Sequence, residues 1–123
     1  MNLLTVAGWS VRISGLIVLA LGLALWTGSF PDLRGIHMLA GLVLVISLWA
    51  VALLAARAGA PAPLVAVALL WGVLTVVFGL YQAQILPGDM HWVVEVGHLV
   101  VGIVAIGLGE ALTARAQAMS ARA

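Results

Sequence analysis

Four long apolar runs constrain the fold of this chain more than any other feature. They span about residues 6–28, 34–57, 63–86 and 90–114, and short breaks containing glycine or proline separate them. A run of roughly 20 apolar residues is long enough to cross a bilayer as an α-helix. Charged residues make up only 7% of the chain, which is too few to cover the surface of a soluble domain. The sequence therefore predicts an all-α fold in which one transmembrane domain of four helices lies in the lipid bilayer.

Several classes of chemistry are excluded by residue types that the chain lacks. It contains no cysteine, which removes disulfides, iron–sulfur clusters, thiolate-bound zinc and thiol catalysis. It contains no lysine either, so no Schiff base to a lysine is available. No phosphate-binding glycine loop or Ser/His/Asp grouping is present, and no basic patch suits a nucleic acid. The sequence predicts no catalytic residue.

The distribution of arginine predicts the orientation of the chain in the membrane. In a bundle of two hairpins, four of the five arginines fall on the side that carries both termini. The fifth falls on the opposite side, near two aspartates. Because arginine-rich ends stay inside, we expect a multi-pass protein of the inner membrane with both termini in the cytoplasm. The four are Arg12, Arg57, Arg115 and Arg122, and the residues of the other side are Arg34, Asp32 and Asp89.

The two halves of the chain read as copies of one helical hairpin. The first run contains Gly15 and Gly22, the third contains Gly72 and Gly79, and the spacing is seven in both. Each following run carries a histidine with a glycine four residues later. Both copies start and end on the same side, so an axis along the membrane normal would relate them. The sequence thus predicts a four-helix bundle built from two repeated helical hairpins.

These histidines are the strongest candidates for a functional site. They lie in the segments His37-Met-Leu-Ala-Gly41 and His98-Leu-Val-Val-Gly102. Residues i and i+4 share one helix face, so each imidazole lies one turn from bare backbone that leaves room for a flat ligand. The repeat places the two histidines opposite each other, and two imidazoles suit haem iron but are too few for tetrahedral zinc. We expect one haem b per chain, with His37 and His98 as its axial metal ligands.

Three further polar residues precede the histidines on the same helix faces. Arg34 and Glu95 lie three residues before His37 and His98, one turn nearer the outer face. Arg34 is expected to bind a haem propionate or to pair with Glu95, since a carboxylate in lipid needs a partner or water. His91 can share the face of Glu95, either as an ordinary interfacial histidine or as a proton- or quinol-binding group.

The pattern resembles a known family of membrane haem proteins. The segments Gly35-Ile-His37-Met-Leu-Ala-Gly41 and Val96-Gly97-His98-Leu-Val-Val-Gly102, one on the second helix and one on the fourth, resemble one half of haem A synthase. More loosely they are similar to b-type cytochromes of the cytochrome b561 kind. The resemblance implies that His37 and His98 are axial ligands. A full haem A synthase has two such bundles and this chain has one, so the resemblance implies haem binding rather than haem modification.

Three functions stay open at this stage. The first is electron transfer near the outer face, from a quinol or to a partner subunit, because two filled axial positions favour electron transfer over oxygen chemistry. The second is a non-redox accessory subunit whose histidines only form hydrogen bonds between helices. The third is a small proton-coupled carrier that uses His91, Glu95 and His98. Small residues on the outer faces also favour a homo-oligomer or a larger membrane complex.

Overall fold

The computed structural model describes residues 1–123 and contains helices but no strands. The four long helices are α1 (Leu3–Trp26), α2 (Arg34–Arg57), α3 (Ala62–Tyr81) and α4 (His91–Ser120). Two short 3₁₀ turns, η1 (Pro31–Leu33) and η2 (Gln82–Gln84), lie between them. Each long helix is apolar and long enough to cross a membrane. The predicted all-α transmembrane four-helix bundle is confirmed.

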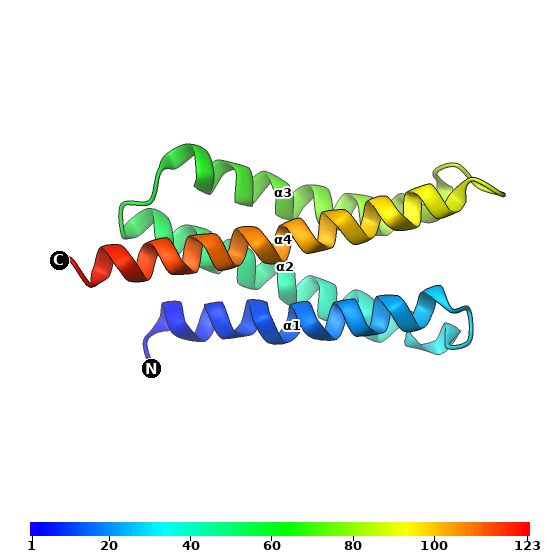
Figure 1. Ribbon diagram of the computed structural model, residues 1–123, viewed down its shortest axis with the longest axis horizontal. Helices are drawn as coiled ribbons and strands as arrows, with labels where there is room; N and C mark the ends of the chain where they lie inside the picture. Colours follow the sequence, from blue (N-terminus) through cyan, green and yellow to red (C-terminus); the bar gives the residue numbers. More distant parts are fainter.

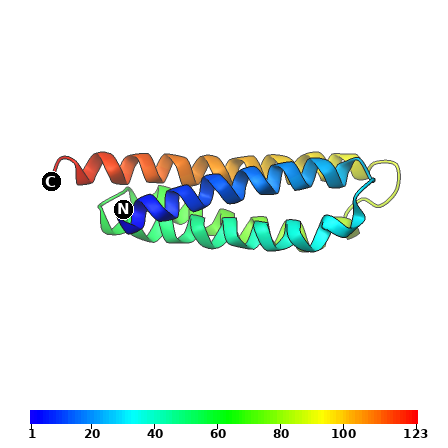
Figure 2. The ribbon, with the colours of Figure 1, turned by 90° about the horizontal axis from the view of Figure 1, so that it is seen from below.

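The bundle consists of two helical hairpins that lie side by side (Figures 1 and 2). Helices α2 and α4 pack against each other and against both remaining helices, whereas α1 and α3 do not touch. Both chain termini lie at one end of the bundle together with the α2–α3 connection, and we call this the terminal end. The α1–α2 and α3–α4 turns lie at the opposite end, which we call the hairpin end. Both termini therefore lie on the same side, as the arginine pattern requires.

Two helices are longer than the apolar runs predict. Helix α1 begins at Leu3 because the Asn2 side chain accepts a hydrogen bond from the backbone N–H of Thr5 at 2.9 Å and caps the helix. Helix α4 continues to Ser120, although the sequence analysis ends it near residue 114. Ala116, in this extension, is fully buried against the core. Packing thus keeps the extension helical despite its lower hydropathy.

Helix α3 is shorter than predicted, and its end lies at the hairpin end. Regular helix stops at Tyr81 instead of near residue 86, and the 3₁₀ turn η2 follows. Leu86 has a φ of 44°, in the left-handed region that non-glycine residues rarely adopt. It precedes Pro87, whose ring disfavours helical backbone in the preceding residue. The chain therefore leaves the bundle here in a loop before α4 begins.

Buried side chains gather in the half of the bundle near the terminal end. No residue of α1 beyond Gly15 is buried, α2 is buried only from Leu44 onward, and α3 only up to Gly72. In α4 burial begins at Val101, apart from Val94. We call this the packed half; its core residues are Ala7, Val11, Leu44, Leu48, Val51, Ala52, Ala55, Ala60, Val65, Ala68, Ala105, Leu112 and Ala116. The other half of the bundle lacks a comparable core.

Hydrogen bonds between side chains and neighbouring helices reinforce the packed half. Donors that would otherwise be unsatisfied in lipid reach a hydroxyl or a backbone carbonyl on the next helix. Trp49 and Trp71 both act in this way and do not line the hollow half described below. The bonds are Ser10–Ser47 between α1 and α2 (2.7 Å), Trp49 Nε1 to the Leu69 carbonyl between α2 and α3 (3.1 Å), and Trp71 Nε1 to the Val101 carbonyl between α3 and α4 (2.9 Å).

An ion pair joins α1 to α4. Arg12 donates from Nε to Glu110 Oε1 at 2.8 Å and from a terminal nitrogen to Oε2 at 3.0 Å. Its guanidinium also lies 5.0 Å from the centre of the Trp9 ring. Glu110 therefore pairs with Arg12 of α1 and not with Arg57 of α2. Arg12 is closer because α1 and α4 run antiparallel, with these two residues at the same level.

Truncation of the core in the packed half is expected to destabilise the bundle. Leu48 is fully buried, whereas Leu53 on the same helix is 55% exposed toward lipid. In a membrane the unfolded helix is also surrounded by apolar groups, so Leu48→Ala loses mainly packing contacts. We expect a cost of about 2 kcal/mol, at the low end of the range for buried leucine. Unfolding in mixed micelles measures it, with Leu53→Ala as a near-neutral control; equal costs would contradict this packing.

Candidate functional site: a cavity with two facing histidines

The half of the bundle near the hairpin end contains a cavity of about 890 Å³. This volume lies within the usual range for small-molecule and cofactor sites, about 300–1,000 Å³. All four helices line the cavity. Its floor is apolar and lies against the packed half, near Val18, Leu44 and Val76. Every residue that the sequence marks as a site candidate lines the cavity: Arg34, His37, Gly41, His91, Glu95, His98 and Gly102.

His37 and His98 face each other inside this cavity. The centres of their rings are 6.1 Å apart, and the ring planes meet at 60°. His37 comes from α2 and His98 from α4, the two helices that pack together at the centre of the bundle. The rings therefore lie within about one helical turn of the same depth, because one turn rises about 5.4 Å. The structure thus brings together the two residues on which the sequence interpretation depends.

A glycine of the preceding helix lies behind each histidine. A Cβ atom added to Gly22 on α1 would lie 3.2 Å from Cε1 of His37. A Cβ atom added to Gly79 on α3 would lie 3.3 Å from Cε1 of His98. These glycines hold equivalent positions in the two hairpins. The sequence repeat therefore appears in the structure as the same glycine–histidine contact in each hairpin. The sequence identifies both glycines as part of the repeat. It does not show that a side chain at either position would crowd the neighbouring imidazole.

One nitrogen of each imidazole, Nδ1, has no hydrogen-bond partner in the protein. Nδ1 of His37 and Nδ1 of His98 are buried and unpaired. The Val18 carbonyl lies near the His37 ring but does not meet hydrogen-bond geometry with Nδ1. The edge of Phe78 covers His98 at 5.8 Å between ring centres. An unpaired polar nitrogen in an apolar site costs free energy, so each ring keeps one unsatisfied polar atom at the wall of the cavity.

The separation of the two rings matches the span of a shared metal ion. Metal–imidazole bonds of about 2.0–2.1 Å put two opposed ligating nitrogens about 4 Å apart, and the ring centres slightly more than 6 Å apart. The observed distance is 6.1 Å. No group of three or more His, Asp or Glu side chains converges in the structure. A metal held here would therefore take its remaining ligands from a group that is not protein.

The glycines that follow the histidines leave open space inside the cavity. Gly41 and Gly102 both line it, and a Cβ atom added to either would meet no atom within 4 Å. Each lies one turn below its histidine on the same helix face. Flat backbone beneath each imidazole therefore gives a planar ligand room to extend toward the floor of the cavity.

The charged residues of the cavity lie at its mouth, near the hairpin end. Arg34 and Glu95 line opposite walls, and neither forms an ion pair, since the one salt bridge in the structure is Arg12–Glu110. The direct Arg34–Glu95 pair considered from the sequence is therefore not formed. His91 Nδ1 is hydrogen-bonded to the carbonyl of Ile85 at 3.1 Å. No hydrogen-bonded chain connects His91, Glu95 and His98.

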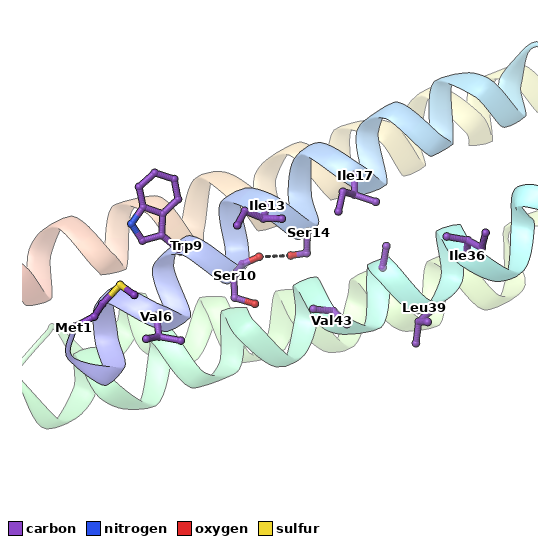
Figure 3. A pocket seen from close by; sticks show the side chains of 11 residues that line it. Met1, Val6, Trp9, Ser10, Ile13, Ser14, Ile17, Ile36, Leu39 and Val43 are labelled. Carbon is purple, nitrogen blue, oxygen red and sulfur yellow. Dashed lines mark hydrogen bonds between the residues drawn. The ribbon is translucent and has the colours of Figure 1, made fainter.

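A second hollow lies on the outside of the bundle, between α1 and α2 (Figure 3). It is an open groove of about 550 Å³ with mostly apolar walls, which include Ile13, Ile17 and Val43. Its two serines are hydrogen-bonded: Ser14 donates to the Ser10 backbone carbonyl, and the Ser10 hydroxyl pairs with Ser47. No titratable side chain lines it. This outer groove therefore adds no titratable group to the site between the histidines.

The fold and the site together define the class of this chain: a multi-pass α-helical membrane protein with a cavity between two histidine-bearing helices. Comparisons with protein-family models, with curated proteins and with solved structures gave no match.

Proposed function

We propose that this chain is a membrane-embedded haem b protein that transfers electrons. His37 and His98 would hold the iron, with one haem expected per chain. The single observation that carries this proposal is that the half-buried rings of His37 and His98 lie 6.1 Å apart inside the cavity, each with a buried, unpaired Nδ1. Histidine is a common ligand of haem iron, so two histidines at this separation could hold one haem between them.

Each part of the cavity contributes to the proposed binding of haem. The two histidines would be the protein's ligands to the iron, and a haem iron without an open position would favour electron transfer over oxygen binding. The backbone at Gly41 and Gly102 leaves the plane between them free, and the apolar walls near Leu44 and Val45 exclude water. When bound, haem b supplies one-electron chemistry by cycling between ferric and ferrous iron. The packed half contains no histidine, so it offers no place for a second haem of this kind.

The proposed site lies toward one face of the membrane. Four of the five arginines lie in the half with the terminal end, so we propose that this end is cytoplasmic and that the cavity opens outward. A redox group held in the cavity would then lie near the outer face of the inner membrane, within reach of a quinol or a partner subunit. A single site at this depth does not carry an electron across the whole bilayer.

The two competing functions have less support in the geometry. A subunit whose histidines only hold helices together should show those hydrogen bonds, and Nδ1 of neither ring forms one. A proton relay through His91, Glu95 and His98 should show a connected chain, and His91 instead bonds to a backbone carbonyl. Both alternatives predict a protein without a visible chromophore.

The absorption spectrum of the purified protein tests the proposal. We expect the detergent-solubilised chain, expressed with haem available, to show a sharp Soret band and split α and β bands after reduction. Such a spectrum reports iron with six ligands, which two axial imidazoles provide. Pyridine extraction measures the stoichiometry, and the expected value is one haem per chain. A folded, colourless protein that takes up no haem on titration would refute the proposal.

A further inference from the structure

The cavity is polar at one end only. Its floor is formed by apolar side chains such as Leu44, whereas Arg34 and Glu95 line the mouth. Arg34 precedes Leu44 by ten residues, which is about 15 Å along the helix. A ligand that fills this space therefore meets hydrocarbon at its inner edge and charge at its outer edge. An amphipathic ligand has only one favourable direction of entry.

The charges at the mouth are free to bind a ligand. Arg34 forms no salt bridge and no side-chain hydrogen bond in the structure, and Glu95 also forms none. They hold equivalent positions in the repeat, each one turn from its histidine, but their charges are opposite. The repeat therefore places equivalent imidazoles on the two helices, whereas the two walls of the mouth carry opposite charges.

Haem b has the matching asymmetry. One edge of its macrocycle carries methyl and vinyl groups, and the opposite edge carries two carboxylates. A guanidinium matches a carboxylate through two parallel hydrogen bonds, and such charge-assisted bonds are stronger than neutral ones. A glutamate beside a second carboxylate repels it, because like charges placed close together in a poorly solvated site raise the free energy of the bound state.

We propose that the mouth of the cavity sets the orientation of the macrocycle: its carboxylate edge lies at the hairpin end, where Arg34 holds one carboxylate and Glu95 opposes the other. This inference rests on the proposed function. Arg34 thus strengthens binding and Glu95 weakens it, although neither touches the iron. The two residues make the site selective for a macrocycle with ionised carboxylates on one edge.

Titration of the haem-free protein with two ligands tests this orientation. The ligands are haemin and the dimethyl ester of the same iron porphyrin, which has lost both carboxylate charges. We expect Arg34→Gln to bind haemin about tenfold more weakly, and Glu95→Gln to bind it several-fold more tightly. The ester should bind both variants and the parent protein equally well. Asp89→Asn is the matched control, because it removes a charge at the hairpin end outside the cavity lining.

The outcomes separate this inference from the proposed function. If Arg34→Gln and Glu95→Gln change the binding of haemin and of the ester by equal factors, or change neither, the orientation is wrong although haem binding stands. If the parent protein binds neither ligand, the proposed function fails and the orientation fails with it. Neither Arg34 nor Glu95 contributes a contact to the core, so circular dichroism should show unchanged helix content in both variants.

Discussion

Replacement of His98 by alanine is expected to abolish the Soret band of the purified protein. The ring of His98 is one of only two that face the centre of the cavity, and no other histidine can take its place from α4. Loss of a group that merely supports a metal ligand costs about 10–100-fold in affinity, so loss of a ligand itself should cost about 100-fold or more. His37→Ala should have the same effect, because the repeat makes the two residues equivalent. Titration with haemin measures both losses.

His91→Ala is the matched control for this experiment. His91 lines the same cavity but lies at its mouth, bonded to the Ile85 carbonyl, and is not expected to ligate. His98→Met separates ligation from packing, because methionine can also ligate haem iron: it should recover binding and raise the reduction potential. Equal loss of binding in His91→Ala and His98→Ala, or no recovery with methionine, would contradict axial ligation by His98.

The hairpin repeat and the facing histidines could be predicted from the sequence because they depend on helical periodicity and on chain direction. Once four apolar runs are accepted as helices, a glycine four residues after each histidine must share its face. Antiparallel hairpins then fix which ends lie together. The equal depth of His37 and His98 follows from their similar distances to the arginines at the terminal end of each helix.

Three features could not be predicted from the sequence. They depend on which helices become neighbours in the bundle or on a local backbone conformation. The Arg12–Glu110 pair requires α1 to lie beside α4, and no local pattern specifies that neighbour. The end of α3 depends on the left-handed backbone at Leu86, which is not visible in its hydropathy. The contrast between a packed half and a hollow half also exists only once all four helices are in place.

This contrast between the two halves has a functional consequence. Many apolar side chains in the half near the hairpin end face lipid or the cavity rather than one another, so most of the buried core lies in the packed half. A ligand-binding space can therefore exist without loss of the fold. Changes inside the cavity should affect binding and leave stability nearly unchanged, whereas core truncations such as Leu48→Ala should do the reverse.

Gly102→Leu is the sharpest test of this separation. A Cβ atom at Gly102 meets nothing within 4 Å, so the larger side chain fits without displacing its neighbours. Leucine also favours helix over glycine by up to about 1 kcal/mol. Yet the new side chain lies on the face below His98, where a macrocycle held by both histidines must extend. We expect unchanged or higher stability in micelles and a loss of haemin affinity of about 5- to 150-fold, since overpacking a filled site costs about 1–3 kcal/mol.

Gly107→Leu supplies the control on the same helix. It also has open space at Cβ, but it faces lipid and lies outside the cavity lining. It should gain the same helix propensity and bind haemin like the parent protein. Gly41→Leu, the repeat-equivalent change on α2, should reproduce the loss seen with Gly102→Leu, because a planar ligand between the two histidines contacts both walls. Full binding by Gly41→Leu and Gly102→Leu would mean that nothing planar occupies the space below the imidazoles, and the assignment of this cavity to a macrocycle would be wrong.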